Sequence, residues 1–285
     1  MKTHVIKTFE YTGKLSDIYL FFDYSINAME YSVVQEKALK KWMNGIPDLV
    51  RNERFINKDL PKEQLEKFAL KAEEQIKESY LNKFNNSNKI ILNMSLVMVC
   101  TVMEMFFEHI FLTIMNANPQ TLLTLTKDRN ITLEQLLKFN DYDKVLDHFK
   151  EKYVEHITRQ GTKEILNAFD SVGIKTNSIF SWSNCTDEVQ KQFASWNYKK
   201  LIDIFNERHS IVHDNHYPIN NVQEFILRKD FFTIIIGNLS IEIWYKFYKY
   251  GVILDSHEII RNAIKAEGGD PNSYPPPPRI GEGVF

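Results

Sequence analysis

Apolar residues recur at steps of three and four along most of the chain, which is the spacing that places them on one face of a helix. Residues 121–137 are also apolar enough for one or two short helices. The clearly periodic segments, which we predict as helices, are 17–43, 62–84, 89–116, 141–160, 162–171, 187–193, 196–217, 220–250 and 255–266. In the segment 141–160 the inward positions are expected to be Tyr142, Val145, Phe149, Tyr153 and Ile157.

Local residues predict where several elements begin and end. Ser16 can cap the first helix, and the polar run Asn-Asn-Ser-Asn at 85–88 predicts a turn between the second and third helices. Residues 1–15 are expected to be an extended lead-in with a short strand at 4–11, and residues 174–186 are expected to form a loop. Since strands and helices do not alternate, the sequence predicts an all-α fold.

The chain divides into three predicted parts. Residues 1–87 form an N-terminal helical extension, residues 88–267 form a helical bundle, and residues 268–285 form a flexible tail with four consecutive prolines, Pro275–Pro278. The N-terminal helices or the proline-rich tail could receive a partner or sensor protein.

The most apolar predicted helix, 89–116, raises the question of a membrane span. Glu104, Glu108 and His109 interrupt it, and a carboxylate in mid-bilayer costs about 2.5–3.5 kcal/mol. We therefore expect a central core helix and no membrane association.

Net charge and cysteine content limit the ligands and the cellular compartment expected for the protein. The formal net charge of -2 gives no argument for a chain that binds polyanions over its whole surface. Cys100 and Cys185 form neither a metal-binding nor a disulfide pattern, which fits a reducing compartment. The first residues lack the apolar core of a signal peptide. A cytoplasmic protein is expected.

The candidate chemistry lies in the predicted helix 196–217, which breaks at Pro218. Leu201, Phe205 and Val212 share one predicted buried face, and Arg208 falls on the same line. An arginine there is costly unless partners satisfy it. His209 and His213 are one turn apart on an adjoining face.

Two interpretations of this segment involve no nucleic acid. Histidines at a helix C-terminus are favoured by the helix dipole, and an arginine can extend past the edge of a core, so the segment can be purely structural. Alternatively, His209, His213 and His216 have the spacing of metal ligands. The glutamate that follows the first histidine in HExxH hydrolases is missing here, where Ser210 stands.

The third interpretation is acid–base cleavage of RNA, whose 2′-OH is a built-in nucleophile. Histidine suits the two proton transfers because it titrates near neutrality. Arginine suits the charge on the phosphorane because it stays protonated and binds phosphate in a fork. This chemistry requires no metal and no cofactor.

The run Arg208–His213 resembles the signature of the HEPN superfamily, in which an arginine, a polar residue and a few variable residues precede a histidine near a helix end. The polar follower is often asparagine or aspartate in that family, and here it is His209. The family is all-α and often carries an acidic residue on an earlier long helix, where Glu104 is the best match and Glu108 the second. The resemblance covers about residues 88–267.

This resemblance implies a metal-independent endoribonuclease of the kind found in toxins and antiviral defence. It implies that His213 acts as general acid or base, Arg208 as phosphate clamp, His209 as orienting group or second proton carrier, and Glu104 as the residue that holds Arg208 or a histidine. It also implies a homodimer. Arg208 and His213 are about 140° apart around one helix, so two facing copies would bring both to one phosphate.

A shared fold does not establish a shared activity. The alternative is a non-catalytic HEPN-like module that binds a nucleotide or a protein, such as an antitoxin or an adaptor.

Overall fold

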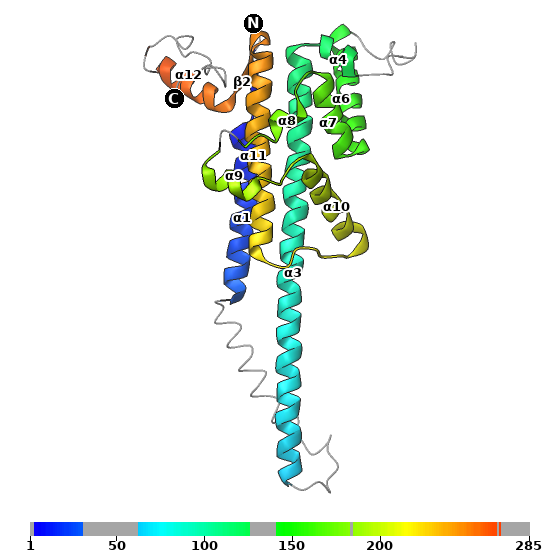
Figure 1. Ribbon diagram of the computed structural model, residues 1–285, viewed down its shortest axis with the longest axis vertical. Coiled ribbons are helices and arrows are strands. Elements are labelled where there is room, and N and C mark those ends of the chain that lie inside the picture. The colour runs from blue at the N-terminus through cyan, green and yellow to red at the C-terminus, as the bar shows by residue number, and fades with distance from the viewer. Residues whose placement is uncertain (1–2, 31–61, 126–140, 183–184, 267, 269–285) are drawn as a thin grey trace.

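The computed structural model describes residues 3–30, 62–125, 141–182, 185–266 and 268, and within them the chain is all-α apart from two three-residue strands (Figure 1). The predicted fold class is therefore confirmed. The elements are β1 His4–Ile6, α1 Thr8–Glu30, α3 Lys62–Ala117, α4 Gln120–Leu125, α6 Tyr142–Gln160, α7 Thr162–Ser171, α8 Thr176–Ile179, α9 Asp187–Phe193, α10 Tyr198–Asp214, α11 Val222–Phe247, the 3-10 turn η1 Tyr248–Tyr250, β2 Val252–Leu254 and α12 Asp255–Ala266.

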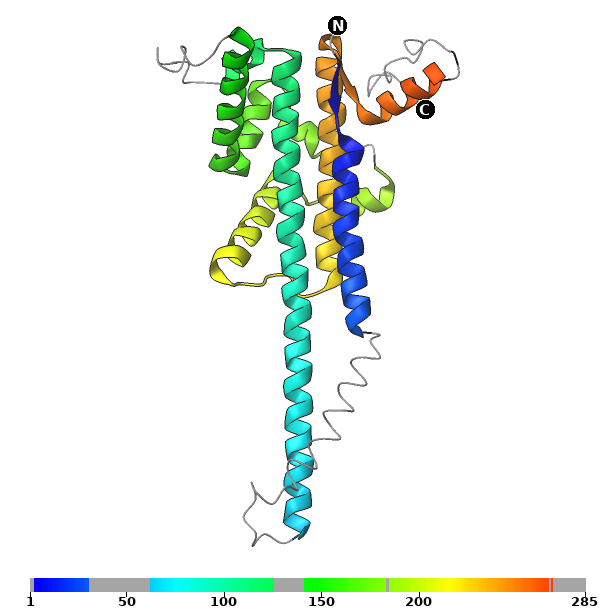
Figure 2. The same cartoon turned by 180° about the vertical axis from the view of Figure 1, so that it is seen from behind.

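A single helix of 56 residues, α3, is the axis of the molecule. Its C-terminal half lies between α1 and α11 on one side and α6, α7 and α10 on the other, while its N-terminal half projects beyond the rest of the described body (Figures 1 and 2). The turn predicted at residues 85–88 is wrong, because those residues continue the helix. The expected boundary at residues 87/88 falls inside α3.

The N-terminus is held by a two-stranded parallel sheet. His4 pairs with Val252, Val5 with Ile253 and Ile6 with Leu254. The strand predicted within 4–11 thus exists but ends at Ile6, and β2 was not predicted.

Helix α1 begins earlier than Ser16, so the predicted cap is wrong. The carboxylate of Asp255, at the start of α12, accepts a hydrogen bond of 2.6 Å from the backbone N–H of Phe9. A free donor of the first helical turn is therefore satisfied from the far end of the sequence. The predicted end of this helix, near residue 43, lies outside the described residues.

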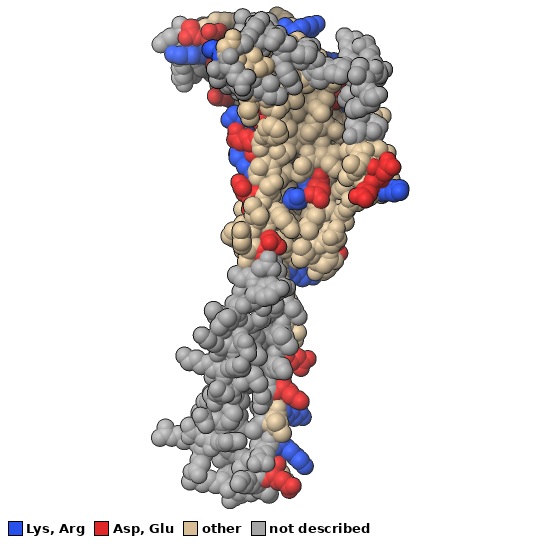
Figure 3. Space-filling model, turned by 90° about the vertical axis from the view of Figure 1, so that its left-hand side faces the viewer, with Lys and Arg blue, Asp and Glu red and all other residues tan. Residues whose placement is uncertain are grey.

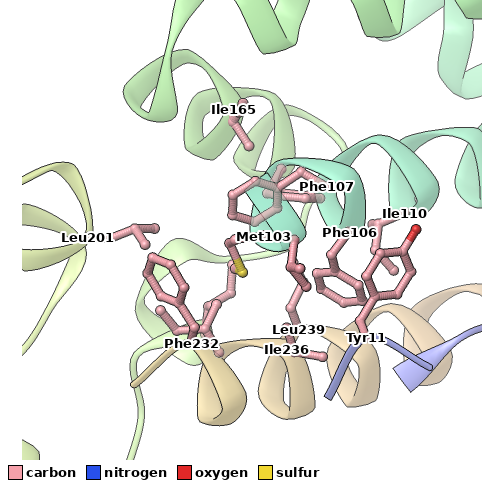
Figure 4. Close-up of a cluster of buried hydrophobic side chains, with 14 of the residues drawn as sticks. Tyr11, Met103, Phe106, Phe107, Ile110, Ile165, Leu201, Phe232, Ile236 and Leu239 are labelled. Atoms are coloured by element: carbon pink, nitrogen blue, oxygen red, sulfur yellow. The ribbon is translucent and has the colours of Figure 1, made fainter. Parts of the chain in front are cut away.

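One apolar core joins α1, α3, α7, α10 and α11 (Figure 4). It is rich in aromatic rings: Phe111 stacks on Phe169 with centroids 4.5 Å apart, and Tyr11 meets Phe106 edge to face. Each fully buried phenylalanine stabilises the fold by about 1.5–3 kcal/mol relative to an exposed one. Since α1 contributes Tyr11, Leu15 and Phe22 to this core, it folds with the bundle.

Several other predictions can be compared with the structure. The helices 162–171, 187–193 and 255–266 have the predicted bounds, and 141–160, 196–217 and 220–250 differ by a few residues at their ends. A short helix, α8, lies in the predicted loop 174–186. Tyr142 and Val212 were predicted to point inward and are wrong, since they are 72% and 49% exposed.

The segment Asn86–Ala117 of α3 is long and apolar enough to cross a membrane, judged by length and composition only. In the fold, 56% of the apolar 18-residue window within this stretch is buried against the rest of the chain. That burial is the arrangement expected of a core helix.

Candidate functional site

Helix α10, which carries three of the four predicted site residues, is fixed at both of its ends. The side chain of Asn197 accepts a hydrogen bond from the N–H of Lys199 and caps the start. At the other end Asn215 adopts the left-handed conformation, with φ of 51°, and its N–H donates to the carbonyl of Ser210. Asparagine tolerates this conformation better than most residues. The helix therefore ends at Asp214, with His213 in its last turn.

The buried face of α10 is rotated from the predicted one. Leu201, Ile204 and Ile211 are buried, and Phe205 packs at the core edge against Phe232. Arg208 lies at the margin of this face, where its side chain is about one-third exposed. It can thus reach both the protein interior and solvent.

Arg208 and Glu104 face each other across the seam between α10 and α3. The NH1 nitrogen of Arg208 lies 3.5 Å from Oε1 of Glu104. This is an ion pair too long for a strong hydrogen bond. The Nε of Arg208 is buried and has no hydrogen-bond partner among the described residues. A buried donor without a partner costs about 1–3 kcal/mol, so the guanidinium is incompletely satisfied.

Burial raises the pKa of Glu104 above its usual value, the nearby Arg208 guanidinium opposes that rise, and the Glu108 carboxylate adds to it. The charged form of this carboxylate is therefore less stable than that of a carboxylate in water. The structure places Glu104, and not Glu108, opposite the guanidinium.

His209 and His213 form a second pair, on the outer face of α10. Their ring centroids are 4.4 Å apart and the ring planes are inclined by 43°. Both side chains are exposed. Among the described residues no hydrogen bond or ion pair joins either ring to Arg208 or Glu104. Within one chain the four predicted site residues thus form two separate pairs.

The structure does not assemble the three-histidine metal site. Among the residues that the structure describes, which include His209, His213 and His216, no three His, Cys, Asp or Glu side chains are placed to hold one ion. The reason is the end of the helix: His216 lies beyond the left-handed turn at Asn215 and does not continue the line of the other two rings.

Two buried polar contacts that hold α10 in place were not recognised from the sequence. Glu207, the neighbour of Arg208, binds Arg228 of α11 through two parallel hydrogen bonds of 2.6 and 2.9 Å. Asn93 of α3, fully buried, accepts a 3.0 Å hydrogen bond from the N–H of Ile219 and donates one of 2.9 Å to its carbonyl. The only local signals were an arginine and an asparagine at inward positions of apolar helices.

A thiol lies beneath the site. Burial raises the pKa of Cys100 well above its usual value, and the carboxylate of Glu104 adds to that rise. The buried thiol is therefore neutral and unreactive at ordinary pH.

The site is separate from the hollow between α4, α6 and α7. That hollow has a volume of about 580 Å³ and is lined by Leu125, Tyr153, His156 and Ala168 among others. None of the predicted site residues lines it. Any substrate of Arg208 and His213 therefore binds outside this hollow.

Comparison of the chain with protein-family models, with curated proteins and with solved structures gives no significant match. The likeness to the HEPN superfamily accordingly rests on the Arg208–His213 motif, on the acidic residue of α3 and on the all-α fold.

Proposed function

We propose that the protein is a metal-independent endoribonuclease of HEPN type that acts in the cytoplasm in toxin or antiphage defence. The observation that carries the proposal is the meeting of Arg208 with Glu104, whose carboxylate lies 104 positions earlier in the chain. An incompletely satisfied guanidinium and two exposed imidazoles on the same helix are suitable groups for binding and cleaving a phosphodiester.

The proposed reaction is an attack of the RNA 2′-OH on the adjacent phosphorus. One histidine takes the 2′-OH proton, the P–O5′ bond breaks, and a protonated histidine gives a proton to the leaving 5′ oxygen. The products are a 2′,3′-cyclic phosphate and a 5′-hydroxyl. His213 is assigned the acid or base step, with His209 as second proton carrier or orienting group.

Arg208 is assigned the stabilisation of the negative charge on the phosphorane. Glu104 is assigned the positioning of Arg208. Because the two pairs point to different sides of α10, one chain alone does not present all four groups to one phosphate. The proposal therefore includes a homodimer in which the α10 helices of two copies face each other.

A second candidate is the non-catalytic binding module. It is favoured by the ion pair itself, since a guanidinium held by Glu104 has less charge free for a phosphate. In that case the exposed face of α10 would receive a nucleotide or a protein.

The two candidates are separated by incubation of the purified chain with RNA in EDTA. The ribonuclease proposal expects cleavage with 2′,3′-cyclic phosphate ends, and toxicity on expression that Arg208→Ala relieves. Absence of both cleavage and toxicity, with RNA or nucleotide binding retained, would favour the binding module.

A further inference from the structure

Two hollows adjoin on the side of the bundle that α4, α6 and α7 form (Figure 1). The first, with a volume of about 580 Å³, falls in the range of about 300–1,000 Å³ that is typical of small-molecule sites. The second, of about 370 Å³, lies where α4 and α7 meet the end of α11. Thr124 and Ser171 line both hollows, and both side chains are small and exposed. A ligand can therefore extend from one hollow into the other.

The first hollow is suited to an apolar group. The buried side chains that line it are mostly apolar, namely Leu125, Tyr153, Ile157 and Ala168. Among the charged residues at its edge, Arg159 pairs with Glu155 at 2.6 Å, so these two charges offset each other. A pocket lined in this way holds a ligand mainly by burying its apolar surface.

One polar group in this lining has no partner in the fold. The side chain of Tyr153 is only 7% exposed, and no described residue forms a hydrogen bond with its hydroxyl. Burial raises the pKa of Tyr153 to about 12, so the hydroxyl keeps its proton at neutral pH and can donate it. A buried donor without a partner is unfavourable, and an acceptor on a ligand would satisfy it. The first hollow therefore favours an apolar group that carries a hydrogen-bond acceptor.

The second hollow supplies positive charge. Lys246 and Lys249 line it, and no aspartate or glutamate is among the described residues that do so. Lys246 donates a 2.9 Å hydrogen bond to the carbonyl of Gly173, which leaves two of its three N–H groups for a ligand. Lys249 lies over the ring of Tyr250, 5.0 Å from its centroid. Two lysines without a carboxylate match the charge of about −1.5 to −2 on a phosphate monoester at neutral pH.

We propose that the two hollows together bind an organic phosphate monoester, with its phosphate at Lys246 and Lys249 and an apolar body that accepts a hydrogen bond from Tyr153. The body can be an acyl chain or an aromatic ring, since both bury apolar surface and both can carry a carbonyl oxygen. None of the predicted site residues lines either hollow. The proposal is therefore independent of the ribonuclease proposal.

The first experiment titrates the purified full-length chain in a calorimeter with lauroyl glycerol phosphate below its micelle concentration, with methylumbelliferyl phosphate and with inorganic phosphate. We expect one of the two organic phosphates to bind with a dissociation constant of about 1–100 μM. Inorganic phosphate should bind at least about tenfold more weakly, because it leaves the apolar hollow unfilled. Tighter binding of the lauroyl ester assigns an acyl-chain ligand, and tighter binding of the umbelliferyl ester assigns an aromatic one. Absence of binding by both would overturn the proposal.

Variants separate binding in the hollows from binding elsewhere. On the side of the molecule where α1 lies, a broad part of the described surface carries no charged side chains, and an apolar probe can also adsorb there (Figure 3). Lys246→Gln/Lys249→Gln should weaken binding of the organic phosphate at least about tenfold. Thr124→Trp should weaken it as well, because the ring fills the place where the hollows adjoin. Lys163→Gln and Leu123→Trp make the same changes at exposed positions that line neither hollow and should bind like the wild type.

The variant Tyr153→Phe tests the hydroxyl alone. Because that hydroxyl has no partner among the described residues, the variant should be as stable as the wild type in urea. It should nevertheless bind the organic phosphate about two- to tenfold more weakly, since both probes carry a carbonyl acceptor. Circular dichroism checks that every variant is folded. Binding that Tyr153→Phe leaves unchanged, or that the lysine variant and Thr124→Trp both leave unchanged, would contradict the proposed site.

Discussion

Glu207 and Arg228 form a two-pronged ion pair that joins α10 to α11 directly beside the candidate site. The Nε of Arg228 donates to Oε2 of Glu207 at 2.6 Å, and the second terminal nitrogen donates to Oε1 at 2.9 Å. The remaining nitrogen donates to the carbonyl of Glu224. Because Glu207 precedes Arg208, this pair fixes the rotation of α10 and thereby the direction in which Arg208 points.

Arg228→Met should lower the free energy of unfolding by about 3 kcal/mol, since it removes both hydrogen bonds to the largely buried Glu207 carboxylate and leaves it only the longer ion pair with Lys200, at 3.8 Å. Urea denaturation at pH 7 measures this loss. Arg159→Met is the matched control, because Arg159 pairs with Glu155 at an exposed position and its loss should change little. The double variant Glu207→Leu/Arg228→Met should be more stable than Arg228→Met alone; equal or lower stability would show that the pair is not coupled.

Asn93→Leu should lower the free energy of unfolding by about 2–4 kcal/mol. The change leaves the buried N–H and carbonyl of Ile219 without partners, at about 1–3 kcal/mol for each group left unsatisfied. Hydrogen exchange should show faster exchange at the Ile219 amide. Asn206→Leu, at an exposed position of α10, is the control and should leave that amide protected. An unchanged exchange rate in Asn93→Leu would contradict the assigned contact.

The sequence predicts those elements whose signals are local. The helix 162–171 follows Gly161 and ends before Gly173, and both glycines have positive φ in the structure. Helix α6 is preceded by Asp141, whose side chain accepts a hydrogen bond from the N–H of Lys144. Such signals for the start and end of a helix can be recognised from the adjacent residues in the sequence alone.

The failed predictions depend on contacts that are distant in sequence. The start of α1 is set by Asp255, 246 residues away from Phe9. The polar run at 85–88 does not break α3, since an asparagine costs only about 0.7 kcal/mol or less in a helix. Val212 and Ile211 are neighbours, and their exposure depends on the rotation of α10 about its own axis, which periodicity alone does not determine.

His109 should make the fold less stable in mild acid. Its Nε2 accepts a 3.2 Å hydrogen bond from the N–H of Lys7, which requires a neutral ring. Burial lowers the pKa of His109 from its usual 6.5, and the charge of Lys7 lowers it further. The unfolded chain therefore takes up this proton first, so stability present above pH 6.5 is lost as the pH falls below that value.

Urea denaturation between pH 7.5 and about pH 5 tests this prediction. His109→Gln keeps an acceptor that cannot be protonated, and its stability should fall less than that of the wild type over this range. His216→Gln, the same change at an exposed histidine, should follow the wild type. Parallel curves for wild type and His109→Gln would remove His109 as the source of the acid sensitivity.

Glu104 should affect the pH dependence of stability in the direction opposite to that of His109. The folded-state pKa of this carboxyl is raised mainly by burial, so the folded chain holds the proton more tightly than the unfolded chain. Stability should therefore fall as the pH rises through 4.5 and above. The free energy of unfolding of Glu104→Gln, measured relative to the wild type, should increase from pH 4 to pH 7. A decrease would show that attraction to Arg208 outweighs burial.

His213→Ala should abolish RNA cleavage and leave the fold intact. The His213 ring is exposed and contacts the His209 ring, so its removal takes little from the core. Loss of a general acid or base lowers the rate by about 10²–10⁴-fold. The cleavage rate in EDTA and the thermal denaturation curve, measured on the same preparation, test both parts. His216→Ala removes a neighbouring exposed imidazole and should cleave like the wild type; equal loss in both variants, or none in His213→Ala, would contradict the assignment of the proton transfer to His213.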